Sequence, residues 1–358
     1  MTPSVPFAER RKISMNVVIL SGGVNTERNV SLNESTYIAD NLRGFGHNVA
    51  IIDMYMGIED YPGISVENIF EQDIPEKWRF ISPAPPDLDE IKRVRHLKSK
   101  SVLGDKVLDI LLLADVVFLC FGGAYGEDGK VQGLLEVLGI PYTGSSTTGC
   151  AIAMNKTITK ELLSYHGIRT PGWKSFCGKD DCQTHLSAVK LPCVVKTPTG
   201  GSSIGTYICY TKKELETAIT NCLEFDKNVL IEDYVEGREF SCGILNDYPL
   251  PPIEILTTNH NYTSKYCEDT PDECPANISH ELEAEIQDIA LRVHKALRLN
   301  GYSRSDFMLS NDGKLYFLEC NVIPGMTPKS LLPKEARAIG IDYGRLCNII
   351  LNTALQRG

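Results

Sequence analysis

The stretch that does most to decide the fold is Lys196-Thr-Pro-Thr-Gly-Gly-Ser-Ser-Ile-Gly205, which follows a short apolar run. A strand that delivers a lysine into a loop of glycine and serine exposes consecutive backbone N–H groups and small hydroxyls, which suit a polyphosphate. The loop lacks Gly-Lys-Ser/Thr and is not a P-loop, and its glycines do not have the G-x-G-x-x-G spacing of a dinucleotide site. Taken alone, it is equally compatible with a flexible turn between two strands.

A second motif lies about a hundred residues downstream. Arg304-Ser-Asp306 opens one strand of a predicted hairpin, Glu319-Cys-Asn321 ends the other, and Asn311-Asp-Gly313 is a strong turn signal between them. Glu319 and Asn321 are two residues apart and therefore share a face. Three oxygen ligands without His or Cys suit Mg²⁺ held together with phosphate oxygens. A capped hairpin end with solvated acids is the alternative, but it does not explain the pairing of Glu-x-Asn with Arg-x-Asp.

Working outward, the pattern predicts an α/β protein. Apolar runs at 16–20, 49–53 and 116–121 alternate with helical spacing at 31–45 and 131–138, which indicates a largely parallel sheet. A second unit has a helix at 155–166, strands at 173–176, 193–196 and 207–210, and a helix at 212–223. The third has strands at 229–233, 239–245 and 250–256, a helix at 279–297, the hairpin, and a helix at 343–356. We predict an extension (1–14), which we expect to be poorly ordered, and units at 15–144, 145–228 and 229–358. Residues 60–105 read as a surface excursion whose basic run, 92–100, is a solvated face.

Composition narrows the function. Among 358 residues, 36 Lys and Arg stand against 46 Asp and Glu, a formal charge of −10, which disfavours a general nucleic-acid binder or a membrane-surface protein. No apolar run approaches the roughly 20 residues that span a bilayer. Twelve cysteines without regular spacing or a Cys-x-x-Cys pair favour reduced thiols in a cytoplasmic enzyme. We therefore expect small-molecule substrates, with neither nucleic acid nor membrane as a partner.

From about Asn16 to Gln356 the sequence resembles the D-alanine–D-alanine ligases of the ATP-grasp superfamily. The resemblance rests on nine stretches in the family's order: Gly22–Leu32, Gly126–Gly133, Pro141–Gly144, Ala153–Lys156, Lys196–Gly205, Leu230–Phe240, Lys265-Tyr266, Arg304–Asp306 and Glu319–Thr327. It implies an ATP-grasp fold preceded by an N-terminal Rossmann-like domain with a parallel sheet. It also implies ATP-dependent joining of D-alanine to D-alanine through an acyl phosphate, for peptidoglycan synthesis, and a possible homodimer. Ligation of other amino acids in a specialised pathway, or an inactive nucleotide-binding regulator, are the alternatives.

The resemblance also implies roles for individual residues. Contacts to ATP are implied for Lys156, Lys196, Ser202, Ser203, Glu232, Val235, Glu239 and Lys265. Asp306, Glu319 and Asn321 would bind two Mg²⁺ ions, for which Mn²⁺ is a possible substitute. Arg304 and the Gly325 N–H would stabilise the oxyanion, and Glu27 would bind the ammonium of the first amino acid. Glu27, Ser202 and Tyr266 would form a hydrogen-bonded set, and Ser330 would bind the carboxylate of the second amino acid.

Two places depart from the family pattern: the loop before Lys265, which reads Asn261-Tyr262-Thr-Ser-Lys-Tyr266-Cys267, and position 122. The family has a His-Gly pair before Gly-Glu-Asp-Gly, whereas here Gly122 stands in the histidine's place. That histidine lies near the first D-alanine, so the selection of the first amino acid is expected to be altered while the chemical machinery is kept. The glycine could leave room for a larger first residue, or Tyr125 could refill the space.

Overall fold

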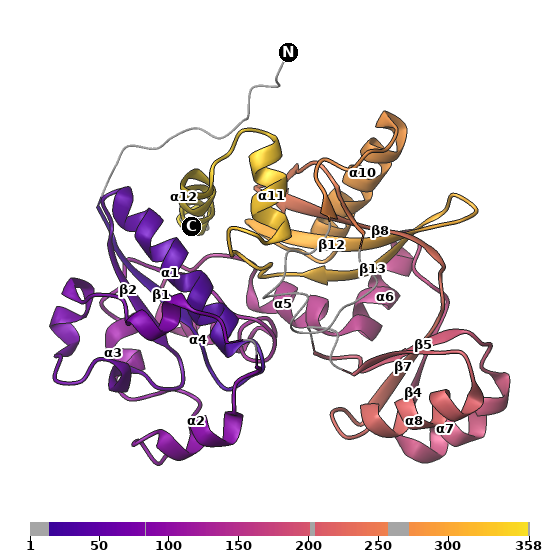
Figure 1. The fold of residues 1–358 in the computed structure, drawn as a ribbon, viewed down its shortest axis with the longest axis horizontal. Helices are drawn as coiled ribbons and strands as arrows, with labels where there is room; N and C mark the ends of the chain where they lie inside the picture. Colours follow the sequence, from indigo (N-terminus) through magenta and orange to yellow (C-terminus); the bar gives the residue numbers. More distant parts are fainter. Residues whose placement is uncertain (1–13, 83, 201–204, 257–271, 357–358) are drawn as a thin grey trace.

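The structure is a computed structural model that describes residues 14–82, 84–200, 205–256 and 272–356. Three sheets organise these residues, each with helices packed against it (Figure 1). The chain is therefore an α/β protein, as the sequence predicts, and its first sheet is parallel.

The first sheet has the strand order β2-β1-β3, with β1 at Asn16–Ser21, β2 at Asn48–Asp53 and β3 at Val116–Leu119. Helix α1 (Arg28–Gly44) connects β1 to β2, and α4 (Lys130–Leu138) follows β3; both contribute to the core of this sheet. The strands are almost continuously buried because a parallel sheet is covered on both faces, which explains their unbroken apolar runs. Their carboxyl ends lead into the Gly22 and Gly122 turns, so both turns lie at one edge of the sheet.

The excursion after β2 is more structured than expected. It contains the short 3₁₀ helices η1 (Ile58–Asp60), η2 (Val66–Glu71) and η3 (Glu76–Arg79), together with α2 (Leu88–Val94) and α3 (Val107–Leu111). The basic run is exposed except at Arg95, so the prediction of a wholly solvated face is wrong at that residue. The Arg95 guanidinium is buried, donates to the carbonyl oxygens of Ser101 (2.8 Å) and Leu103 (2.5 Å), and lies over the ring of Tyr55.

The central sheet has the order β4-β7-β5-β6, and its pairs are antiparallel. These strands span Trp173–Cys177 (β4), Cys193–Lys196 (β5), Thr206–Cys209 (β6) and Asn228–Asp233 (β7), and helices α7 (Gly178–His185) and α8 (Lys212–Cys222) pack against them. A capping box begins α8, with Thr211 and Glu214 exchanging hydrogen bonds. The sequence analysis placed β7 in the third unit, but it pairs with β4 and β5. The domain boundaries themselves stay predictions.

The third sheet has the order β11-β10-β8-β12-β13, and β9 pairs with β8. Its strands are β8 (Gly237–Leu245), β9 (Tyr248–Pro249), β10 (Ile253–Ile255), β11 (Asp272–Glu273), β12 (Tyr302–Ser310) and β13 (Leu315–Asn321). Helices α5 (Thr147–Met154), α6 (Lys156–Tyr165), α10 (His280–Ala296), α11 (Leu331–Ala338) and α12 (Tyr343–Ala354) surround it. The predicted hairpin is confirmed as β12 and β13.

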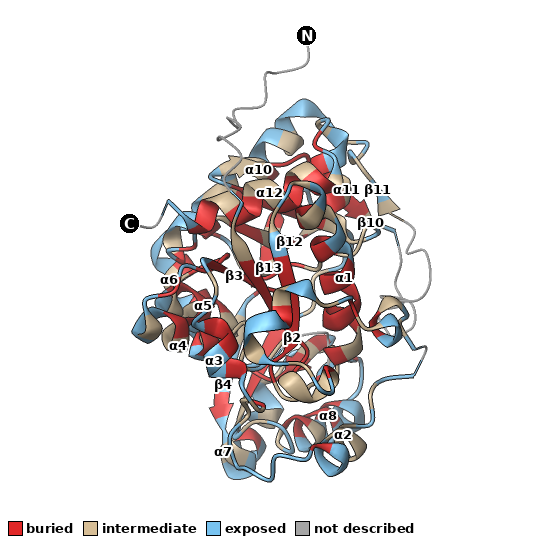
Figure 2. Ribbon diagram, turned by 90° about the vertical axis from the view of Figure 1, so that its left-hand side faces the viewer, coloured by how far each residue is buried: buried red, intermediate tan, exposed pale blue. Residues whose placement is uncertain are grey.

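The described residues form two apolar cores of very different extent, and buried positions run through all the sheets (Figure 2). The larger core joins the first and third sheets, so that Ile19 and Phe118 belong to the same cluster as Phe240 and Leu346. Contact between α1 and α12 is part of this junction. The smaller core, which includes Val195, Leu215 and Val229, lies wholly within the central unit.

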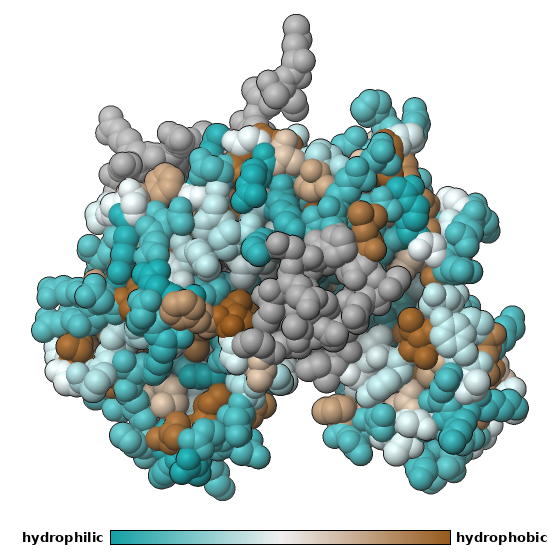
Figure 3. All heavy atoms as spheres, viewed as in Figure 1, coloured by the Kyte–Doolittle hydropathy of each residue, from teal (hydrophilic) through white to brown (hydrophobic). Residues whose placement is uncertain are grey.

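The surface seen from the side of Figure 1 is mostly hydrophilic, and the lower parts of the first and central units stand apart on it (Figure 3). None of the described helices is both long and apolar enough to cross a membrane. All of the cysteines in the described segments are free thiols, most of them buried.

Candidate active site

The hairpin of β12 and β13 gathers the residues predicted to bind metal. Asp306 lies directly opposite Glu319 and Arg304 opposite Asn321, so these side chains come from paired positions. The Asn321 Nδ2 donates to Asp306 Oδ2 (3.2 Å), and Ser241 Oγ of the neighbouring strand β8 donates to Asp306 Oδ1 (2.6 Å). The sequence therefore predicted correctly that Asp306, Glu319 and Asn321 meet in space.

Arg304 forms a two-pronged contact with the same carboxylate. Its Nε donates to Asp306 Oδ1 and its Nη2 to Asp306 Oδ2, both at 3.0 Å. Burial lowers the pKa of Arg304, but the adjacent Asp306 charge more than offsets this, and the guanidinium pKa rises above its usual value. Arg304 is thus a fixed cation at the end of the hairpin, held in a defined plane by its bidentate partner.

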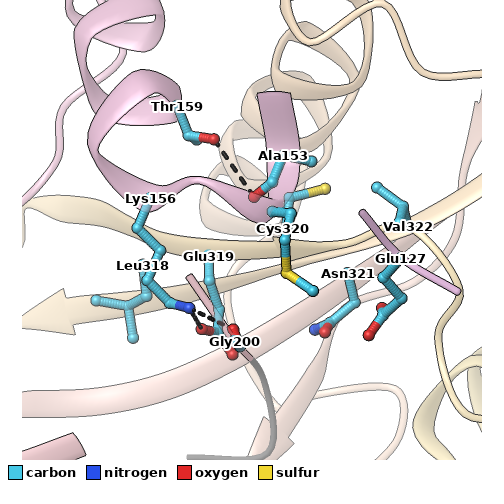
Figure 4. A pocket seen from close by; sticks show the side chains of 11 residues that line it. Glu127, Ala153, Lys156, Thr159, Gly200, Leu318, Glu319, Cys320, Asn321 and Val322 are labelled. Atoms are coloured by element: carbon cyan, nitrogen blue, oxygen red, sulfur yellow. Dashed lines mark hydrogen bonds and ion pairs between the residues drawn. The ribbon is translucent and has the colours of Figure 1, made fainter. Parts of the chain in front are cut away.

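A pocket opens between this hairpin and the helices α5 and α6 (Figure 4). Lys156, the first residue of α6, projects into it, with its Nζ 3.8 Å from Glu319 Oε2 and donating to the carbonyl oxygen of Gly200 at 2.8 Å. Glu319 and Asn321 line the same pocket. Burial lowers the pKa of Lys156, so this lysine is poorly solvated and suited to an anionic ligand. The structure thus places Lys156 beside the predicted metal ligands.

A buried charge cluster of Lys160, Lys196 and Glu232 interacts electrostatically with Lys156. Lys196 on β5 and Lys160 on α6 approach opposite oxygens of Glu232 on β7, at 2.8 and 2.9 Å. Burial raises the pKa of Glu232, but the two lysine charges outweigh it and leave the pKa below its usual value. Burial also lowers the pKa of Lys160 to about 8. Two predicted ATP ligands, Lys196 and Glu232, therefore lie together.

Two further predicted nucleotide contacts, Val235 and Glu239, follow Glu232 along the chain. Val235 is in the connection after β7 and lines a hollow with Tyr234, Glu236 and Asp312. Glu239 is on β8, opposite Ile255 and Met308. Ser202, Ser203, Lys265 and Tyr266 lie outside the described residues, so their predicted roles stay predictions.

Glu27 precedes α1 at the carboxyl edge of the first sheet, and its side chain lies against the backbone of Gly122. A Cβ built on Gly122 would lie 1.6 Å from Glu27 Oε2, and its three nearest neighbours among the described residues are all Glu27 atoms. The Glu27 carboxylate therefore occupies the space beside Gly122. The structure supports neither a gap for a larger residue at this point nor refilling by Tyr125.

The turn after β13 places Gly325 and Ser330 together. A Cβ on Gly325 would lie 3.1 Å from Ser330 Oγ and 3.2 Å from Glu34 Oε1. The Ser330 hydroxyl accepts the Thr327 N–H (3.1 Å) and bonds to the Thr327 hydroxyl (2.8 Å). Tyr343 Oη, at the start of α12, also donates to the Met326 carbonyl oxygen (2.5 Å), and this hydrogen bond connects the turn to that helix.

Comparisons with known proteins cover most of the chain. Residues 16–145 match the family description "D-ala D-ala ligase N-terminus", and residues 158–352 match "D-ala D-ala ligase C-terminus". The chain belongs to the D-alanine–D-alanine ligase family. A D-alanine–D-alanine ligase of Lacticaseibacillus casei is 37% identical over 349 residues, which are 96% of each chain, and one of Pediococcus pentosaceus is 38% identical over 341 residues, covering 94% of this chain and 97% of that protein.

Solved structures of the family share the fold. A Bacillus anthracis D-alanine–D-alanine ligase complexed with ATP aligns over 96% of this chain and 98% of its own, with 30% identity and a TM-score of 0.72. A ligase from Coxiella burnetii aligns over 96% of this chain and 94% of its own, with 25% identity and a TM-score of 0.73. The ATP-grasp fold expected from the sequence is thereby confirmed.

Three acidic or basic residues of this D-alanine–D-alanine ligase family member were missed by the sequence analysis. Lys160 could have been found from its spacing, because it is four residues from Lys156 and so lies on the same helix face. Glu127 lies within a recognised motif without an assigned role; it accepts the Gly123 N–H (2.6 Å), and burial raises its pKa to about 8. Glu34 had no signal, because nothing local distinguishes a buried glutamate on α1 from a solvated one.

Proposed function

We propose that this chain joins D-alanine to D-alanine, using ATP to activate the first carboxylate as an acyl phosphate. The observation that carries the proposal is the pocket in which Lys156 faces Glu319 and Asn321, beside the Arg304–Asp306 pair. A lysine, a fixed arginine and a set of oxygen ligands on one hairpin suit transfer of a phosphoryl group to a carboxylate. An inactive regulator would not need this set of charged residues and oxygen ligands, which argues against that alternative.

The donor set fits divalent cations. Asp306, Glu319 and Asn321 offer only oxygen ligands, and phosphate oxygens would complete the coordination of Mg²⁺. Within the described ranges no three His, Cys, Asp or Glu side chains come together as a metal cluster, and the set here is two carboxylates and one amide. Bound there, Mg²⁺ would neutralise phosphate charge and orient the transferred group.

The residues of the chain then have the following roles. Lys156 and Lys196 bind ATP phosphates, and Glu232, Val235 and Glu239 contact its nucleoside, with Ser202, Ser203 and Lys265 contributing from the undescribed segments. Glu27 holds the ammonium of the first D-alanine, in a set with Ser202 and Tyr266. Ser330 holds the carboxylate of the second, whose amine attacks the acyl phosphate. Arg304 and the Gly325 N–H stabilise the oxyanion as the C–N bond forms and phosphate leaves.

An ADP-release assay over a panel of D- and L-amino acids tests the proposal. We expect strong Mg²⁺-dependent ADP release with D-alanine, a D-alanyl-D-alanine product by mass spectrometry, and no turnover by Glu319→Gln, because a neutral amide would hold a divalent cation far more weakly than a carboxylate. Preference for another amino acid would overturn the substrate assignment. Wild-type-like ADP release by the Glu319→Gln protein would overturn the metal assignment.

A further inference from the structure

Glu34 is a buried carboxylate that the proposed mechanism does not use. It lies on α1, seven residues after Glu27 and three after Ser31, and these spacings place all three on one face of the helix. That face is turned toward the Gly325–Ser330 turn, since Glu34 Oε1 is 3.2 Å from the position a Cβ on Gly325 would take. Glu34 therefore lies directly behind the two groups assigned to the oxyanion and to the second amino acid.

The contacts of Glu34 link it to this turn rather than to solvent. The backbone of Met326 and Thr327 opposes the rise in the pKa of its carboxyl group, and the Cys120 thiol lies 3.6 Å from its Oε2. Ser330 Oγ is 3.1 Å from the same point beside Gly325 that Glu34 Oε1 approaches. Solvent therefore does little to screen the electrostatic effect of a charge on Glu34 at the position of Ser330.

The described residues place no cation close enough to balance that charge. Within the described part of the chain, no Lys, Arg or His side chain comes within 4 Å of Glu34, and the neighbouring charged group is Glu27, of the same sign. Burial, reinforced by Glu27, raises the pKa of Glu34 to about 7. Glu34 in turn raises the pKa of three neighbouring groups from the end of β3, from β12 and from α12: Cys120, Tyr302 and Tyr343.

We propose that Glu34 is a specificity-determining residue for the second amino acid, which binds well when Glu34 is neutral and poorly when it is ionised. The inference rests on the proposed function, in which Ser330 holds the second carboxylate. A neutral Glu34 presents no charge to that carboxylate, whereas an ionised one repels it across a poorly solvated space. Raising the pH through neutrality then weakens binding at the second subsite.

The isosteric variant Glu34→Gln cannot ionise and therefore tests the inference. Steady-state rates over a wide D-alanine range resolve the two KM values. For each site, the ratio of the wild-type KM to the Glu34→Gln KM is measured from pH 6 to pH 8. We expect this KM ratio for the second site to rise on the order of tenfold, because only the wild type gains a charge that repels the second carboxylate. Deprotonation of the substrate amine affects both proteins equally and cancels in the ratio.

The KM for ATP should show no such pH-dependent ratio, and Asp60→Asn, which removes a buried carboxylate remote from the turn, should behave as wild type. If Glu34→Gln folds poorly, Glu34→Ser removes the same charge with a smaller side chain and should give the same result. A ratio that stays flat with pH in active enzymes overturns the role of Glu34 and leaves the proposed function standing. Absence of D-alanine-dependent ADP release from the wild type at any pH overturns both.

Discussion

The backbone at Gly122 approaches Glu27 so closely that even a methyl group would overlap its carboxylate. Gly122 does not have a positive φ, so its conformation is open to other residues and the close approach is the reason for glycine. The identity of this one residue therefore bears on where the ammonium-binding carboxylate lies. The family histidine cannot be accommodated here unless Glu27 moves.

Gly122→Ala and Gly122→His should accordingly raise the KM for the first amino acid by about tenfold or more, because both displace Glu27 from its position. The KM for ATP should change far less, since the nucleotide residues lie on other elements. Both constants can be measured with D-alanine as the varied substrate and then with ATP. Equal changes in the two constants, or a change confined to ATP, would show that Gly122 does not line the first amino-acid pocket.

The role of Arg304 depends on the planar geometry of its guanidinium as well as on its charge. Arg304→Lys keeps the charge but loses the planar pair of donors that Asp306 holds at 3.0 Å, so we expect kcat to fall on the order of 10²–10³-fold. The affinity for ATP, measured by equilibrium binding, should stay near that of the wild type. Arg238→Lys is a matched control, because Arg238 forms a similar bidentate pair with Glu254 on the same sheet. Collapse of ATP affinity with an unchanged kcat would make Arg304 a nucleotide ligand instead.

At the scale of elements, helix α6 carries two lysines with different environments. Lys156 reaches into the pocket, whereas Lys160, one turn later, is buried against Glu232. The helix thereby connects the central sheet to the pocket through charged groups rather than through apolar packing alone.

Lys160→Met should lower the free energy of unfolding by about 3 kcal/mol, because it leaves the buried Glu232 with one cation in place of two. It should also weaken ATP binding, since Lys196 is then drawn more strongly to Glu232. Urea denaturation measures the first effect. Lys174→Met, an exposed lysine on β4, is the control and should change stability by well under 1 kcal/mol. A loss for Lys160→Met no larger than that of the control would mean that the cluster contributes little.

The hairpin of β12 and β13 shows what the sequence could predict. Its turn residues and alternating strands are local signals, and pairing then determines that Asp306 meets Glu319. Helix α7 was not predicted, because Gly178–His185 has no apolar stripe, and α5 and α11 are only two turns long. The partner strands of β7 were misjudged because sheet membership depends on distant residues, and the burial of Glu34 is equally non-local.

At the scale of the whole molecule, the two apolar cores imply that heat does not disrupt the protein all at once. The central unit has a core of its own, while the first and third sheets share one, so calorimetry of the protein without ligand should show two overlapping endotherms. A nucleotide held between Lys196 of the central unit and Lys156 and Glu319 beside it would couple the unfolding of the two cores. Saturating ATP and Mg²⁺ should therefore merge the two endotherms into one sharper endotherm at higher temperature. A single endotherm in the absence of ligand would show that the cores melt as one. Two cores with a ligand across them would thus make cooperativity a property of the loaded enzyme rather than of the polypeptide.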